Sequence, residues 1–177
     1  MGILRPNLPT ILTLSRIVLI PVFILIVYHR PVLGAVIFII ASITDFLDGY
    51  LARRLGSVTK FGIILDPIAD KFLVISALIV LVDMERLSPW IAIVIIAREF
   101  LVTGLRVVAL SKNIVMPAEV GGKIKTTTQI IAILCLILMG SILNIDLYDI
   151  GMVFILIALV LSIISGMQYT VSFWRKI

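Results

Sequence analysis

Residues 45–70 read DFLDGYLARRLGSVTKFGIILDPIAD and place four carboxylates within 26 residues of an otherwise apolar sequence. The first two acids, Asp45 and Asp48, are three residues apart, so on a helix they lie on one face. The other two, Asp66 and Asp70, are four residues apart and form a stripe on a second helix. If the two helices pack as a hairpin, the four carboxylates converge on one small volume. Charges gathered in an apolar setting are costly unless cations accompany them.

The composition of the whole chain is typical of an integral membrane protein. Of its 177 residues, 62% are hydrophobic and 14% are charged. The single cysteine, Cys135, lies in an apolar run and excludes disulfides and cysteine metal sites. The net charge is +5, but the basic residues are scattered between hydrophobic stretches. Anionic lipid and anionic substrate, rather than nucleic acid, are therefore the expected partners.

Six stretches are long and apolar enough to cross a bilayer, which takes about 20 residues. They are residues 9–28, 32–54, 62–83, 88–111, 124–144 and 149–173. The first is too continuous with the rest of the chain to be a cleaved signal peptide. The sequence therefore predicts an all-α integral membrane protein with six transmembrane helices in a single domain, residues 1–177.

The basic residues gather on one side of the predicted membrane. Of the 15 lysines and arginines, only Arg30 and Arg86 fall on the opposite side. Lysines and arginines in the short loops of a membrane protein stay on the cytoplasmic side. We therefore expect both termini and the acidic stretch to face the cytoplasm from the cell (inner) membrane.

Three interpretations of the four carboxylates stay open at this point. Salt bridges to basic neighbours such as Arg53 and Lys71 could satisfy some of them, but would not explain Gly49 and Gly62 on the same faces. A site for hard cations such as Mg²⁺ fits the all-carboxylate donor set, and two ions could clamp a transferring phosphoryl group. A cation transporter would also carry intramembrane acids, usually near the midplane and with internal repeats. The position of these acids at the ends of their spans favours an enzyme.

The same stretch resembles the signature of the CDP-alcohol phosphotransferase family. That signature, D-x₂-D-G-x₂-A-R followed after eight residues by G-x₃-D-x₃-D, is filled at every position from Asp45 to Asp70. The resemblance covers the whole chain and implies a membrane enzyme of six helices, a homodimer, with a two-metal site facing the cytoplasm. It also implies a reaction in which an alcohol attacks the β-phosphorus of a CDP-linked lipid and releases CMP.

The resemblance further implies a role for each matched position. Two Mg²⁺ or Mn²⁺ ions would be held by four ligands, Asp45, Asp48, Asp66 and Asp70. Asp70 would also take the proton of the attacking hydroxyl. The CDP-diacylglycerol would be bound by residues at the start of the first span, at the end of the second and in the loop after it. They are Asn7, just before the first span, and Thr10, Asp48, Gly49, Ala52, Arg53 and Thr59.

The fourth and fifth spans indicate which alcohol is used. Arg98 and Arg106 are eight residues apart, hence nearly on one helix face, and Glu99 lies beside the first. Arg98 lies well inside an apolar run, which ordinary positive-inside charge does not explain. Lys123 and Lys125 open the fifth span on the same side of the membrane. Buried arginines suit forked recognition of phosphate, so the sequence predicts an acceptor that carries its own phosphate.

The stretches IAREF (96–100) and GKIKT (122–126) are similar to the phosphatidylglycerophosphate synthase branch of the family, whose acceptor is sn-glycerol 3-phosphate. The hypothesis is therefore transfer of the phosphatidyl group from CDP-diacylglycerol to sn-glycerol 3-phosphate. Inositol-phosphate transfer and cardiolipin synthesis would keep the metal site and change only the acceptor pocket. A cation transporter is the alternative from another class.

Overall fold

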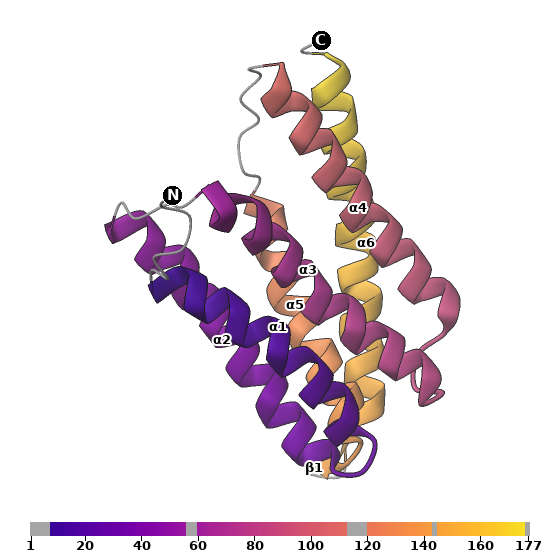
Figure 1. Ribbon diagram of the computed structural model, residues 1–177. Helices are drawn as coiled ribbons and strands as arrows, with labels where there is room; N and C mark the ends of the chain where they lie inside the picture. The colour runs from indigo at the N-terminus through magenta and orange to yellow at the C-terminus, as the bar shows by residue number, and fades with distance from the viewer. Residues whose placement is uncertain (1–7, 56–59, 113–119, 143–144, 176–177) are drawn as a thin grey trace. The chain divides into compact units, whose positions relative to one another are not determined.

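The computed structural model describes residues 8–55, 60–112, 120–142 and 145–175, and within these ranges the chain forms six α-helices and one short β-hairpin (Figure 1). The elements are α1 (Leu8–Val27), α2 (Pro31–Leu55), α3 (Lys60–Asp83), α4 (Pro89–Ser111), α5 (Val120–Leu138), β1 (Ser141–Ile142), β2 (Ile145–Asp146) and α6 (Leu147–Trp174). The predicted six-helix, all-α architecture is confirmed for these ranges. The chain divides into two compact units, Met1–Val80 and Leu81–Ile177. The single domain stays a prediction.

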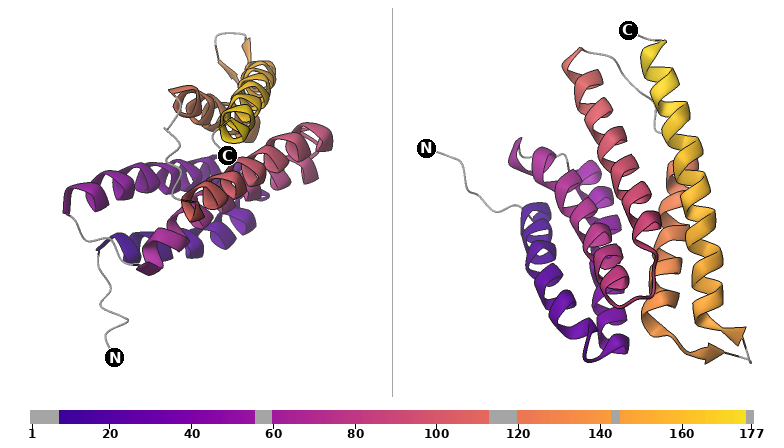
Figure 2. Two further views of the ribbon diagram at one scale, coloured as in Figure 1. Left: turned by 90° about the horizontal axis from the view of Figure 1, so that it is seen from above. Right: turned by 90° about the vertical axis from the view of Figure 1, so that its right-hand side faces the viewer.

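The first unit is built on a helical hairpin in which α1 and α2 pack side by side (Figures 1 and 2). In the half of the hairpin near its turn, the rings of Phe23 and Phe38 lie 5.8 Å apart, and both side chains are fully buried. The helices come close together at Gly34, where a Cβ atom would lie 2.8 Å from Val27. A residue without a Cβ is therefore required there, and it sets the close spacing of the hairpin.

The second unit is organised around α6, which packs against both α4 and α5 (Figure 2). Its buried residues form one stripe at helical spacing, Gly151, Ile155, Ala158, Ser162, Ser165, Gly166, Tyr169 and Phe173. Most of them are small, which lets the neighbouring helices approach; a Cβ atom on Gly151 would lie 2.8 Å from Leu136. The stripe also brings polar atoms into the interior, and these build the candidate site below.

The predicted extent of the fifth span, residues 124–144, is wrong at both ends, because α5 begins at Val120 and ends at Leu138. The early end has a local cause. Met139 adopts a left-handed backbone with φ of 38°, a conformation that stops an α-helix. The helix does not continue, and the carbonyl oxygen of Gly140 instead accepts a hydrogen bond from the N–H of Leu147 at 2.8 Å.

A two-stranded antiparallel hairpin follows, in which Ser141 pairs with Asp146 and Ile142 with Ile145 (Figure 2). Asp146 also caps α6, because its carboxylate oxygen Oδ1 accepts the N–H of Tyr148 at 3.0 Å. The hairpin explains how an apolar stretch can leave α5 without continuing as a helix.

The connection between α3 and α4 is fixed by Arg86. Its Nη1 atom donates to the carbonyl oxygens of Ile137 at 2.7 Å and Leu136 at 3.2 Å, in the last turn of α5. A cation at a helix C-terminus satisfies open carbonyls and opposes the helix dipole. Burial lowers the pKa of Arg86 from its ordinary value, but an arginine stays charged at any physiological pH.

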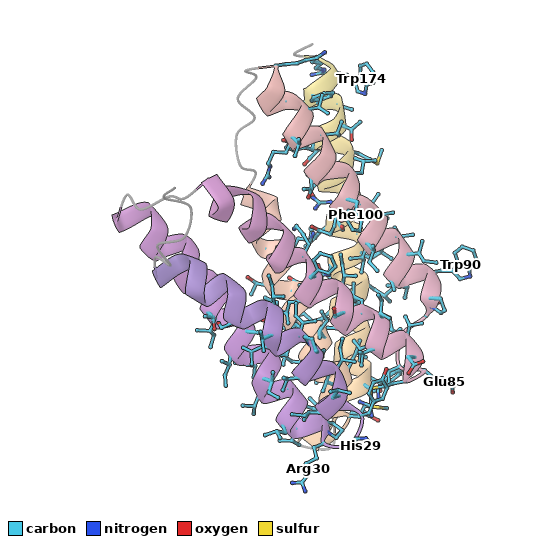
Figure 3. The ribbon with its side chains drawn as sticks, viewed as in Figure 1. His29, Arg30, Glu85, Trp90, Phe100 and Trp174 are labelled. Atoms are coloured by element: carbon cyan, nitrogen blue, oxygen red, sulfur yellow. The ribbon has the colours of Figure 1, made fainter. Side chains whose placement is uncertain are left out.

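We expect Arg86→Ala to lower the free energy of unfolding by about 2 kcal/mol, the contribution of hydrogen bonds to a charged group. The measurement is thermal unfolding of the purified protein in detergent. Arg30→Ala is the matched control, because Arg30 is an exposed arginine in another inter-helix turn (Figure 3). Equal shifts for both variants would contradict the assigned role of Arg86.

Both units carry large apolar side chains on their outer faces, among them Val18, Leu25 and Val32 in the first and Ile93 and Val107 in the second. Among the described residues, one helix, Leu147–Trp174, is long and apolar enough to cross a membrane. Shorter apolar helical segments are Ile17–Val27, Pro31–Thr44 and Ile124–Leu138.

Candidate functional site

The four signature aspartates lie on the two helices that the sequence predicted. Asp45 and Asp48 belong to α2 and Asp66 and Asp70 to α3, so each pair occupies one side of its helix. Their side chains lie outside the described residues. Carboxylates alone, without histidine or cysteine, are the donor set that Mg²⁺ and similar hard cations take. The residues present therefore fit a divalent metal site.

The residues predicted to bind CDP-diacylglycerol fall on the same unit. Gly49, Ala52 and Arg53 continue the face of α2 that begins with the first two aspartates. Thr10 is in the first turn of α1, with its side chain outside the described residues. Asn7 and Thr59 lie outside the described residues altogether.

Arg98 is anchored to α6 by two hydrogen bonds. Its Nε atom donates to the carbonyl oxygen of Ser162 at 3.0 Å, and Nη2 donates to the hydroxyl of Ser165 at 2.6 Å. A third nitrogen, Nη1, donates to Glu99 Oε1 at 3.1 Å. The side chain is only 15% exposed. The prediction that this arginine lies in the interior is confirmed.

Glu99 joins Arg98 to Lys125. The same oxygen, Oε1, that accepts from Arg98 also forms an ion pair with the ammonium group of Lys125. Glu99 and Lys125 are 6% and 3% exposed, so neither charge is in contact with bulk water. Buried charges persist only when paired. Arg98, Glu99, Lys125, Ser162 and Ser165 are called the polar cluster below; it links α4, α5 and α6.

Arg106 lies two turns beyond Arg98 on α4 and also turns toward α6. Its guanidinium carbon is 6.0 Å from the centroid of the Tyr169 ring, at the outer limit of a cation–π contact. Since Tyr169 is four residues after Ser165, both arginines meet the same stripe of α6. The predicted shared face is confirmed. Lys123 is in the first turn of α5, and its side chain lies outside the described residues.

Several polar residues that lie beside these basic side chains are not predicted from the sequence. Ser162, Ser165 and Tyr169 in α6 have the spacing of one helix face, and Gln129 is four residues after Lys125. Polar residues repeating along one face of an otherwise apolar span are the signal that could have found them.

Gly166 of α6 packs directly against the side chain of Arg98. A Cβ atom on Gly166 would lie 3.0 Å from Cγ of Arg98 and 3.4 Å from its Nε. By contrast, a Cβ atom on Gly104 of α4 would meet nothing within 4 Å. The two glycines therefore form a matched pair for substitution.

We expect Gly166→Ala to destabilise the protein by about 1–3 kcal/mol, the usual cost of overpacking a core. Gly104→Ala should be neutral or stabilise by up to about 1 kcal/mol, since alanine favours the helix. Thermal unfolding of both variants in one detergent measures the difference. A Gly166→Ala protein as stable as wild type would mean that Arg98 moves freely.

Comparison with known proteins agrees with the resemblance seen in the sequence. The CDP-alcohol phosphatidyltransferase family profile matches residues 6–164. A protein of Bacillus subtilis (strain 168) named CDP-diacylglycerol--glycerol-3-phosphate 3-phosphatidyltransferase is 42% identical over 97% of each chain. Proteins with the same name from Rickettsia bellii and Shigella flexneri serotype 5b are 44% and 40% identical over at least 92% of each chain. The chain therefore belongs to the CDP-alcohol phosphatidyltransferase family.

Proposed function

We propose that this protein transfers the phosphatidyl group of CDP-diacylglycerol to sn-glycerol 3-phosphate, giving phosphatidylglycerophosphate and CMP. One observation carries the proposal: relatives that share the name of this reaction match over more than nine-tenths of both chains. The complete aspartate signature supports the phosphoryl chemistry, and the buried basic residues of the second unit support a phosphorylated acceptor.

The first unit supplies the residues for the CDP-lipid. The family generally uses divalent metal ions, and Asp45, Asp48, Asp66 and Asp70 are the residues that would hold two Mg²⁺ or Mn²⁺ ions. When bound, such ions neutralise the charge of the pyrophosphate. Asn7, Thr10, Gly49, Ala52 and Thr59, with Asp48, would line the CDP-lipid pocket, and Arg53 would pair with the pyrophosphate.

The reaction requires little covalent chemistry from the protein itself. A hydroxyl of the acceptor forms a bond to the β-phosphorus as the bond to the CMP oxygen breaks, and the carboxylate of Asp70 takes the hydroxyl proton. Positioning and charge neutralisation dominate such phosphoryl transfers.

The second unit supplies the residues for the acceptor phosphate, Arg98, Arg106, Lys123 and Lys125. Among those with described side chains, Arg98 and Lys125 both contact Glu99, and Arg106 lies two turns further along α4. These cations supply the positive charge that recognition of a phosphate group requires. An arginine already fixed by its neighbours loses little freedom when the anion binds, which favours affinity.

We further propose that the protein spans the cell (inner) membrane six times, with both termini and the active site facing the cytoplasm. The apolar outer faces of both units support this, as does the one-sided distribution of basic residues. Trp90 and Trp174 are 75% and 70% exposed and project from opposite ends of the α4–α6 pair (Figure 3), as interfacial anchors do. The homodimer implied by the family resemblance stays a prediction.

The test offers radiolabelled glycerol 3-phosphate, myo-inositol 1-phosphate and phosphatidylglycerol separately to the purified protein with CDP-diacylglycerol and Mg²⁺. We expect CMP release with glycerol 3-phosphate in large excess over the other two. A preference for either of the others would overturn the assigned acceptor. Cation flux into liposomes without any CMP release would favour a transporter.

A further inference from the structure

Three side-chain atoms in the described part of the second unit are buried and have no hydrogen-bond partner. They are Nε2 of Gln129, Oγ of Ser162 and Oη of Tyr169. The three residues are 3%, 0% and 4% exposed. Leaving a buried polar group unsatisfied costs roughly 1–3 kcal/mol, and such groups are rare in folded proteins. Three of them on two neighbouring helices therefore need an explanation, and contact with a bound polar ligand would satisfy them.

Ser162 belongs to the polar cluster, and Gln129 and Tyr169 are each one helical turn from one of its members, Lys125 and Ser165. The backbone carbonyl of Ser162 already accepts from Arg98 at 3.0 Å. Gln129 is one turn beyond Lys125 on α5, hence on the same side of that helix. Tyr169 lies under Arg106. The unsatisfied atoms thus accompany the same basic side chains that would hold an anion.

The chemistry of the atoms matches a small phosphorylated polyol. The amide nitrogen of Gln129 only donates hydrogen bonds, so it needs an acceptor oxygen such as that of a phosphate. The hydroxyls of Ser162 and Tyr169 both donate and accept, which suits another hydroxyl group. A lipid chain would satisfy none of the three.

We propose that Gln129, Ser162 and Tyr169 recognise the acceptor by hydrogen bonding its phosphate and its free hydroxyl, and so help to select it. This inference rests on the proposed function, in which the acceptor is sn-glycerol 3-phosphate. The residues act as specificity determinants, while the charges of the polar cluster supply attraction. A site built to bond a hydroxyl rejects an analogue that lacks it, because the site's own polar groups then stay unpaired.

The test removes one polar atom at a time, with Tyr169→Phe, Ser162→Ala and Gln129→Leu. For each variant kcat, KM for glycerol 3-phosphate and KM for CDP-diacylglycerol are measured, together with thermal unfolding with and without glycerol 3-phosphate. We expect KM for glycerol 3-phosphate to rise roughly tenfold, the loss of one hydrogen bond, with KM for CDP-diacylglycerol within twofold of wild type. The stabilisation by glycerol 3-phosphate should shrink in parallel.

Tyr148→Phe is the control, because it makes the same change at the other end of α6. If the variants unfold at higher temperature but keep wild-type kinetics, the atoms are merely unsatisfied and the inference is overturned. Should Gln129→Leu or Ser162→Ala fail to fold, Tyr169→Phe decides, since it keeps the ring. Wild-type protein inactive with glycerol 3-phosphate would instead refute the proposed function, and the same variants would then be compared with the acceptor that is used.

Discussion

Replacing Asp70 with asparagine should reduce turnover by about 10²- to 10⁴-fold, the range for removing a general base. Asparagine keeps the shape of the side chain and the helix of α3, so the protein should still fold and insert. It removes the negative charge on which both proposed roles of Asp70 depend, metal binding and proton transfer. CMP release from CDP-diacylglycerol by the purified variant measures the loss.

Asp149→Asn provides the control for this loss. Asp149 is an exposed carboxylate in the first turn of α6, and its substitution should leave turnover near wild type. A folded Asp70→Asn protein with near-normal turnover would remove Asp70 as the base. Treatment of wild type with EDTA should give a comparable loss that added Mg²⁺ or Mn²⁺ restores. Recovery of the variant at high metal concentration would assign Asp70 to metal binding alone.

The helices were predictable because their apolar stretches are long and bounded by charge and turn residues. The exception, the end of α5, shows the limit of hydropathy. Ile142 and Ile145 are as apolar as any residue of a span, yet they belong to a two-residue strand pair. What stops the helix is the left-handed backbone of Met139, and methionine carries no sequence signal for that conformation.

The candidate site also has one part that the sequence predicts and one part that it does not. The aspartate signature is local, so its spacing alone predicts which helix faces carry the carboxylates. Arg98 is predictable because an arginine inside an apolar run is unusual, but its partners Ser162 and Ser165 are more than 60 residues away. The spacing of the two serines on one face of an apolar helix is a local signal, but it does not show which residue they contact. Only the packing of α4 on α6 brings them to the arginine.

Glu99 is the residue whose removal should cost the most stability. Its Oε1 atom faces both Arg98 and Lys125, and its substitution leaves two cations in an interior where Lys125 is 3% exposed. Breaking a buried ion pair by removing one partner costs about 3–5 kcal/mol. We expect the loss of stability in Glu99→Gln to be near the lower end of that range, because the amide oxygen still accepts one hydrogen bond. That corresponds to a Tm lower by roughly 6–12 °C in a chain of this size.

The control is Glu85→Gln, which makes the same chemical change at an exposed position of the α3–α4 connection (Figure 3). Its Tm should stay within about 2 °C of wild type, as for most surface substitutions. Comparable losses in both variants would mean that the net charge of the protein, rather than the buried pair, determines stability.

A double substitution separates the structural role of the pair from its role in binding. Glu99→Gln with Lys125→Met removes both charges of the buried pair, and replacing a buried ion pair by uncharged residues of similar size is often neutral. The double variant should therefore recover most of the Tm lost in Glu99→Gln. Its KM for glycerol 3-phosphate should nevertheless stay well above that of wild type, because Lys125 is absent. If stability and KM recover together, the pair serves only to join α4 to α5; if stability alone recovers, Lys125 binds the acceptor and Glu99 is the anion that allows a lysine to be buried there.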